Sequence, residues 1–243
     1  MIVMHPMLMS VINLLKVKNK ELMMIFKIDG KELMVKKGNK KPIPQFVWIV
    51  SMESGTDCSS RKNGHCDIGE NCYVLKYESN KLMYKTIERR RKDEECIDYL
   101  VENDLADELS DWFIKRNNSA KTFKLKFLRW NESGDCKSLE HFLFVEKVAL
   151  KLFDEIGAIS VIYTHRRDLW EQFKKIRKSE HCLIVNGSGF MADNNFKAVK
   201  EFTMENDVCS SNCVQCFEDG LYYCYDIENK GNTIEELLRV NKR

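Results

Sequence analysis

The sequence has little of what would place it in several large classes of protein. It has only three prolines, Pro6, Pro42 and Pro44, which leaves no room for a proline-rich linker. Its net charge of +2 is too small to predict a nucleic-acid or membrane partner by itself. No apolar run is long enough to span a bilayer, and the apolar start lacks the basic region and small-residue cleavage site of a signal peptide. We therefore expect a cytoplasmic protein with no membrane partner.

The first residues form an apolar segment of another kind. The run MIVMHPMLMSVINLLKVK predicts an amphipathic helix over Leu8–Val17. The alternative is an over-called start, with initiation at Met4, Met7 or Met9.

The composition describes a globular chain with one sizeable core. Of 243 residues, 44% are hydrophobic and 31% are charged. Lysine, glutamate and isoleucine are abundant and glutamine is scarce, which is typical of a thermophile or of an AT-rich genome.

Short apolar runs alternate with helical patterns along the chain. Asp29-Gly30 lies between two apolar runs and predicts a β-hairpin over residues 22–37. The predicted strands are 45–52, 123–130, 159–165 and 182–189, and the predicted helices are 80–117 in two or more pieces, 138–156, 168–178, 195–202 and 233–242.

This order predicts an α/β fold, either a partial (β/α) barrel or an open parallel sheet, with an N-terminal hairpin and a cysteine-rich C-terminal segment. We divide the chain into 1–44 (helix and hairpin), 45–205 (α/β core) and 206–243 (cysteine-rich segment and helix). The first cysteine loop and the segments 131–135, 164–168 and 186–189 each follow a predicted strand. We expect all four at the same edge of the sheet, where ligand sites of such folds lie.

Seven of the ten cysteines fall in two clusters, which is the most informative feature of the chain. In a reducing compartment such clusters indicate metal binding or catalysis rather than disulfides. The first has the spacing C-x7-C-x5-C and the second C-x3-C-x2-C-x7-C; their members are Cys58, Cys66 and Cys72, then Cys209, Cys213, Cys216 and Cys224.

Each cluster is compatible with more than one metal. Three thiolates can hold a [4Fe–4S] cubane by three irons and leave the fourth iron open, or they can bind zinc with His65, Asp57 or Asp67 as a fourth ligand. Four thiolates can close a zinc site or a fully ligated cluster. Structural disulfides of a thermophile are the third alternative.

Four motif regions between Gln45 and Cys224 carry a family resemblance. They are Cys72-Tyr73, Tyr163-Thr164, the cysteine-rich C-terminus and the run Arg129-Trp130-Asn131-Glu132-Ser133-Gly134-Asp135. In this order they resemble the phage and archaeal "gene product 88" family, whose layout is similar to that of radical S-adenosylmethionine (SAM) proteins.

The resemblance implies roles for particular residues. Cys58, Cys66 and Cys72 would hold a cluster, and Ser133, Gly134 and Asp135 would lie where SAM binds through its amino group. Gly187 and Gly189 would let the backbone approach an adenosine. An electron donor would then be a partner. The first loop departs from the C-x3-C-x2-C spacing of radical SAM enzymes, which the first three cysteines of the second cluster match instead.

Several of these residues also have structural interpretations. Residues 133–135 can be a turn into a helix with Asp135 or Ser138 as its N-cap, and the glycines of 186–189 can serve a turn. Arg129 can bind a substrate carboxylate or phosphate, or pair structurally with Glu132 or Asp135. His165 can be a general acid or base, or a structural or merely exposed side chain.

The leading hypothesis is an iron–sulfur protein with one or two [4Fe–4S] clusters and, more specifically, a SAM-dependent radical enzyme of unknown substrate. The alternative is a zinc-stabilised binding protein with no catalytic activity, for nucleic acid or a protein partner.

Overall fold

The computed structural model describes residues 23–38, 45–66, 68–199, 222–224 and 234–239. The predicted N-terminal helix and the residues Cys209, Cys213 and Cys216 lie outside these ranges.

In the described ranges, nine strands form one sheet, and strands that are neighbours in sequence are neighbours in space. The pairs β1–β2 and β2–β3 are antiparallel, each step from β3 to β8 is parallel, and β9 is antiparallel to both β7 and β8. The strands are β1 (Met23–Ile28), β2 (Lys31–Lys37), β3 (Val47–Val50), β4 (Phe127–Arg129), β5 (Ile159–Thr164), β6 (Leu183–Ser188), β7 (Asn194–Val199), β8 (Tyr222–Cys224) and β9 (Ile234–Arg239). The predicted α/β fold with a mostly parallel open sheet and an N-terminal hairpin is confirmed.

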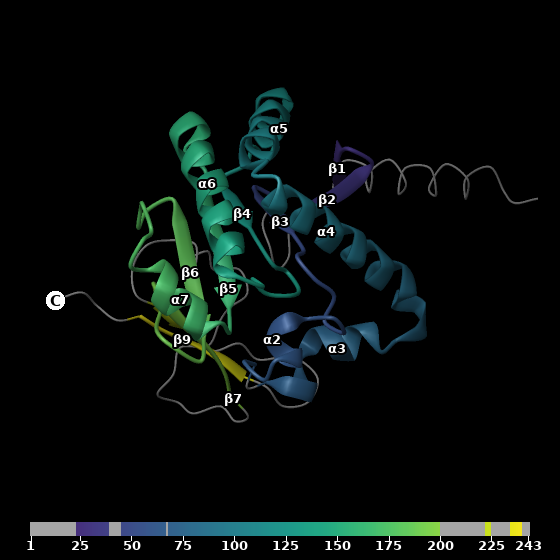
Figure 1. Cartoon of the computed structure of the whole chain (residues 1–243), viewed down its shortest axis with the longest axis vertical. Helices are drawn as coiled ribbons and strands as arrows, with labels where there is room; N and C mark the ends of the chain where they lie inside the picture. Colours follow the sequence, from purple (N-terminus) through teal and green to yellow (C-terminus); the bar gives the residue numbers. More distant parts are fainter. Residues whose placement is uncertain (1–22, 39–44, 67, 200–221, 225–233, 240–243) are drawn as a thin grey trace, which may run out of the picture.

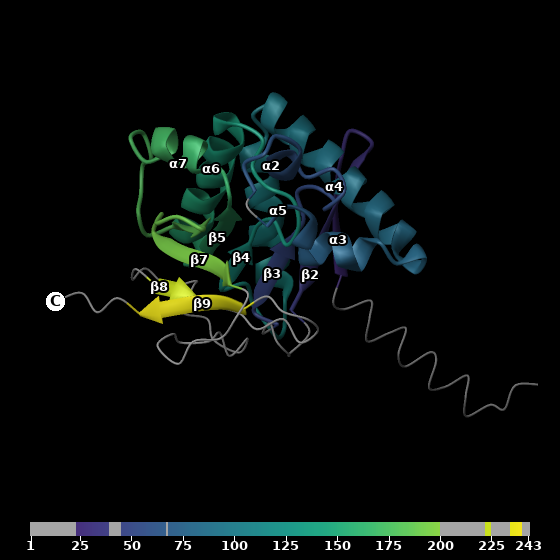
Figure 2. The same cartoon turned by 90° about the horizontal axis from the view of Figure 1, so that it is seen from below.

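The helices lie on one side of the sheet (Figures 1 and 2). Right-handed crossovers between parallel strands that follow one another in order place every connecting helix on the same face. The α-helices are α2 (Ser59–Lys62), α3 (Tyr73–Glu78), α4 (Tyr84–Glu102), α5 (Ala106–Ser119), α6 (Leu139–Ile156) and α7 (Arg167–Phe173), with 3₁₀ turns η1 (Gly69–Asn71) and η2 (Lys81–Met83).

The alternation of side chains along the strands divides the sheet between two apolar clusters. Trp48, Leu128 and Ile162 point to the helix side and belong to the main core. Ile49 and Val161, one position along, belong to a smaller cluster on the opposite face. Strands buried on both faces read as continuous apolar runs, which explains why their sequences show no polar alternation.

Helix α6 follows the sequence prediction closely. It begins after Ser138 and ends at Gly157, which has φ 66° and supplies the left-handed conformation that ends many helices. Strand β4 is shorter than predicted, because Phe123 adopts φ 54° and the ladder pairs only from Phe127.

Two predicted helices are wrong. Residues 194–199 form β7 instead of starting a helix at 195, and residues 234–239 form β9 inside the predicted C-terminal helix 233–242. Ile234, Leu237 and Leu238 lie among residues with good helix propensity, but pairing with β7 and β8 overrides that weak local preference.

Candidate functional site

Three loops meet at the carboxyl edge of the parallel strands. The loop after β3 contacts the loop after β4, because the Met52 N–H donates to the Ser133 carbonyl at 3.1 Å. The loop after β4 contacts the end of β5, because the His165 N–H donates to Asp135 Oδ2 at 2.9 Å. Three of the four segments predicted to share an edge are therefore joined by direct hydrogen bonds.

A buried carboxylate holds the start of the first loop. The side chain of Glu53 accepts hydrogen bonds from the Ser59 N–H, the Ser59 hydroxyl and the Asp135 N–H, each at 3.1 Å. Burial raises the pKa of this carboxyl, and the N–H groups of Ser59 and Asp135 oppose the rise. No motif in the sequence pointed to Glu53. The one feature that could have indicated it is an acidic residue directly after a predicted buried strand.

The Ser133-Gly134-Asp135 turn packs against the first loop and does not face an open space. The Ser133 hydroxyl donates to the Glu53 carbonyl, and a Cβ on Gly134 would lie 2.4 Å from the Glu53 nitrogen. Asp135 accepts from the Ser60 hydroxyl at 2.6 Å, besides its bond from His165. Both Ser133 and Asp135 are buried. The turn is therefore the structural link between two loops.

Arg129, Gly187 and Gly189 do not join that turn. Arg129 alternates with the core residues of β4, points to the opposite face, and stacks on Tyr163 with its guanidinium carbon 4.9 Å from the ring centroid. A Cβ on Gly187 would lie 2.3 Å from the Phe190 carbonyl oxygen, so packing accounts for that glycine. Gly189 has φ 82°, which is the turn conformation predicted as the alternative to ligand binding.

Cys58 lies at the near end of the loop, directly before α2. Burial raises the pKa of its thiol to about 12; the N–H groups of Arg61 and Ser60 lower it, and the negative charges of Asp135 and Glu53 raise it further. Cys58 is therefore protonated at neutral pH. Cys136 has a related environment, since burial and then the Asp135 and Glu53 charges raise its pKa well above the usual range.

Cys66 lies at the far end of the loop, where the local charge is opposite. Burial would raise the pKa of its thiol, but a side-chain hydrogen bond with His165, the charge of that imidazole and the N–H groups of Gly69 and Ile68 lower it below the usual value. At a given pH, Cys66 is more ionised than an ordinary cysteine. Thiolate is the form that attacks electrophiles and binds metals.

Cys72 is the neighbour of Cys66. It precedes α3, and burial raises the pKa of its thiol; the N–H groups of Leu75 and Val74 oppose the rise, and the negative charge of Cys66 adds to it. The cysteines Cys58, Cys66 and Cys72 are all half-buried free thiols. In the part of the chain that the structure describes, no three His, Cys, Asp or Glu side chains converge as a group that could hold a metal ion.

The other predicted ligands are dispersed. Asp57 binds Ser54 and Arg91, and its pKa is lowered to about 2, first by the Arg91 hydrogen bond. His65 Nδ1 lies 4.0 Å from Asp168 Oδ1. Asp67 is outside the described residues. Of the second cluster, Cys224 ends β8, where it is paired in register with Phe196 of β7.

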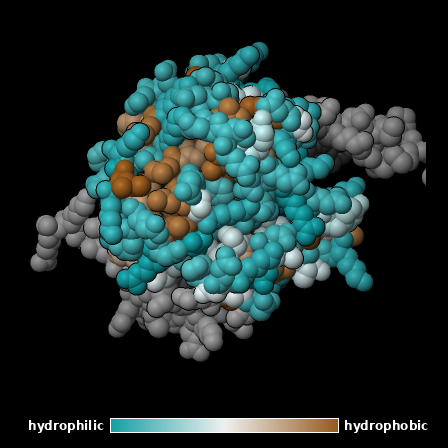
Figure 3. All heavy atoms as spheres, in the orientation of Figure 1, coloured by the Kyte–Doolittle hydropathy of each residue, from teal (hydrophilic) through white to brown (hydrophobic). Residues whose placement is uncertain are grey.

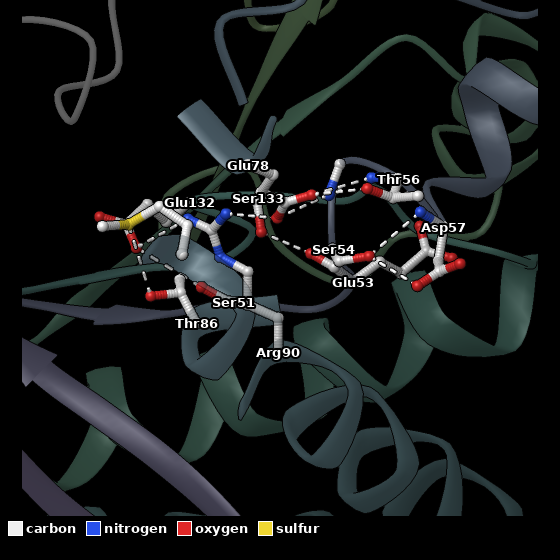
Figure 4. A network of polar contacts seen from close by, with 12 residues as sticks. Ser51, Glu53, Ser54, Thr56, Asp57, Glu78, Thr86, Arg90, Glu132 and Ser133 are labelled. Carbon is white, nitrogen blue, oxygen red and sulfur yellow. Dashed lines mark hydrogen bonds and ion pairs between the residues drawn. The ribbon is translucent and has the colours of Figure 1, made fainter. Parts of the chain in front are cut away.

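A buried ion pair fixes the far end of the loop to α4. Arg90 donates to Glu78 at 2.7 Å, and the side chains are 7% and 1% exposed. Glu78 also accepts from the Gly55 N–H at 3.1 Å and from the N–H and hydroxyl of Thr56 at 3.0 Å. Figure 4 shows the Arg90 side chain between Glu78 and Glu132, whose carboxylate lies 3.8 Å from the guanidinium. This anchor was not predicted, because nothing in the sequence pairs position 78 with position 90.

Among the described residues no helix is long and apolar enough to cross a membrane. No protein-family model, curated protein or solved structure matches the chain, so the resemblance to the gene product 88 family stays a prediction.

Proposed function

We propose that this chain is a cysteine-ligated metal protein and that the first loop binds an iron–sulfur cluster of the [4Fe–4S] type. The observation that carries the proposal is the position of Cys58, Cys66 and Cys72. All three are half-buried free thiols in one loop at the carboxyl edge of a parallel sheet, where sites of such folds lie.

Thiolates suit a soft metal, and two of the three thiols lie close to each other. Cys66 is enriched in thiolate, and Cys72 lies near enough to feel its charge. Cys58 would have to lose its proton and turn its thiol away from the N–H groups of α2 to bind the metal. A bound cluster would supply one-electron chemistry at this edge.

The residues assigned to SAM do not fit an amino-group site as they stand. The Ser133 hydroxyl and the Asp135 carboxylate are buried and already bonded to Glu53, Ser60 and His165. SAM binding remains a prediction that rests on the family resemblance, and we propose only the metal.

Zinc is the second candidate, and the imidazole of His165 favours it. Zinc binds mixed thiolate and imidazole sets, and His165 already contacts Cys66 beside Cys72. Closed zinc sites in both clusters would make the chain a binding protein with no catalytic activity.

The test is anaerobic purification followed by a visible spectrum and by iron, sulfide and zinc analysis of one sample. The proposal expects a brown protein with about four irons per cluster. Cys66→Ala and Cys72→Ala should lose the first-loop metal, while Cys96→Ala, a buried core cysteine in α4, should keep it. Cys213→Ala separates the contribution of the second cluster.

The outcomes are distinct. Stoichiometric zinc without iron, lost in the same two variants, would replace the cluster by the zinc candidate. A protein that binds neither metal after anaerobic reconstitution, with all cysteines open to alkylation, would overturn both.

A further inference from the structure

The turn between α3 and α4 exposes an unusual amount of apolar and aromatic surface. Tyr77 is 51% exposed, Leu82 78% and Tyr84 55%, all within eight residues. Single exposed apolar residues are ordinary on a protein surface, but three so close together mark an interaction site. We call residues 76–85 the Lys–Tyr corner; it lies where the outer end of α4 meets α3 (Figure 1).

The charge of this corner is of one sign. Lys76, Lys81 and Lys85 are exposed, and the only carboxylate between them, Glu78, is buried against Arg90. Within the described ranges none of the three lysines has a carboxylate partner within ion-pair distance. Lys85 Nζ lies 5.7 Å from the centroid of the Tyr84 ring, so cation and ring form one surface.

Hydrogen bonds and a buried ion pair fix the backbone of the corner. Asn80 caps η2, accepting the Leu82 N–H on its side chain at 3.0 Å and the Met83 N–H on its carbonyl at 2.8 Å. The buried Glu78–Arg90 pair joins α3 to α4 beneath the exposed side chains. Fixed rings lose less conformational entropy when they bind a ligand than mobile ones.

We propose that the Lys–Tyr corner binds single-stranded nucleic acid. Aromatic rings on which bases stack, with lysines beside them for the phosphates, are the usual elements of sequence-tolerant single-strand binding. A protein partner fits less well, because lysine is depleted in the cores of protein interfaces. Duplex DNA fits less well because stacking needs an unpaired base.

A second apolar surface offers a matched contrast. Figure 3 shows hydrophobic residues over α6, where Phe153 is 40% exposed. Both lysines of α6, Lys147 and Lys151, form ion pairs with aspartates, so this helix lacks the uncompensated positive charge of the corner. Phe153→Ala therefore serves as a control for the loss of an exposed ring.

The test is fluorescence anisotropy of a labelled 20-nucleotide oligo(dT) at two salt concentrations. We expect Tyr77→Ala and Tyr84→Ala each to weaken binding by about tenfold, with Tyr→Phe retaining it. The triple variant Lys76→Glu, Lys81→Glu, Lys85→Glu should remove binding, and Lys85→Ala alone should lower the slope of log K against log salt by about 0.7. Phe153→Ala should bind as wild type, as should Lys175→Glu, which reverses the charge of an exposed lysine that follows α7. Circular dichroism checks that every variant is folded.

Three outcomes would overturn the proposal. One is no binding of oligo(dT) at low salt. Another is binding that the corner variants leave unchanged. The third is a corner that instead binds anionic vesicles or a second copy of the chain, seen as vesicle co-sedimentation or as a dimer that Leu82→Ser dissociates. None of these readouts depends on the metal, so failure here and failure of the proposed function are separable.

Discussion

The two ends of the first cysteine loop contain the same kind of residue in opposite electrostatic surroundings. At the near end, burial raises the thiol pKa of Cys58 to about 12, and the carboxylates of Asp135 and Glu53 add to the rise. At the far end, burial also acts to raise the pKa of Cys66, but the hydrogen bond and charge of the His165 imidazole, with nearby N–H groups, outweigh it, and the pKa falls. The two anchors also differ: the hydrogen bonds to Glu53 come from hydroxyl and N–H donors, whereas Glu78 accepts from the Arg90 guanidinium in addition to the groups of Gly55 and Thr56. Position at the carboxyl edge therefore does not by itself make a thiolate; at Cys66 the imidazole of His165 outweighs the burial that dominates at Cys58.

Alkylation of the metal-free protein should show the largest difference. With a pKa near 12 instead of 9.0, Cys58 has about a thousandfold less thiolate than an ordinary thiol, since each pKa unit is a factor of ten. Iodoacetamide at pH 7.5 should modify Cys66 long before Cys58. Peptide mass spectrometry measures the rate at each cysteine. His165→Gln should slow Cys66 and leave Cys58 unchanged, and His65→Gln should change neither. Equal rates at the two cysteines would remove the contrast.

Removal of the cation at the far anchor should cost the most stability. Arg90→Met leaves the Glu78 carboxylate buried without its cation, which typically costs about 3–5 kcal/mol. Urea unfolding measures the loss. Adding Glu78→Gln should recover part of it, because the neutral amide needs no counter-charge. Arg91→Met, one residue further along α4, is the control; its side chain is 53% exposed, and its loss should cost under about 1 kcal/mol.

The sequence predicted those features of the site that depend on local patterns, and it missed those that depend on contacts between residues far apart in the chain. Strand position comes from local apolar runs, and the parallel arrangement then places Ser133 and His165 at one edge. The contacts of Glu53 with Asp135 and of Glu78 with Arg90 depend on the paths of the loops between the strands and helices. No local sequence pattern predicts those paths. For the same reason the sequence left the Ser133-Gly134-Asp135 motif open between a ligand site and a turn, and the structure bonds its groups within the protein.

The near anchor should respond weakly to mutation but with a characteristic pH dependence. Glu53 has a folded-state pKa raised above 4.5, so its ionisation opposes folding, and wild-type stability gains as pH falls through that raised pKa toward 4.5. Glu53→Gln cannot make this gain and loses one acceptor, at about 1 kcal/mol. The stability deficit of the variant should therefore be larger at pH 5 than at pH 7.5 in urea titrations. A deficit that shrinks at pH 5 would mean that the carboxylate, not the acid, is the form the fold favours.

The smallest expected change in stability is at Asp57, a carboxylate of the near end that pairs with the cations Arg91 and Lys62. Asp57 accepts from Arg91 at 2.8 Å, and that bond, against an opposing effect of burial and with the help of bonds from Ser54 and Lys62, lowers its pKa from 3.8 to about 2. A depressed acid pKa adds stability above pH 3.8 that is lost as pH falls toward 2. Because Arg91 is exposed, solvent screens the pair, and Asp57→Asn should cost under about 1 kcal/mol at pH 7.

The cost of Asp57→Asn should shrink as pH falls below 3.8 and be lost below about pH 2. It should also shrink in 1 M salt, because salt at that concentration screens exposed pairs beyond roughly 3 Å. A cost that persists in high salt would instead place the contribution of Asp57 in its hydrogen bonds with Ser54, which hold the turn just before Cys58. In that case the near end would be held by neutral donors throughout, and the charge contrast with the far end would be sharper.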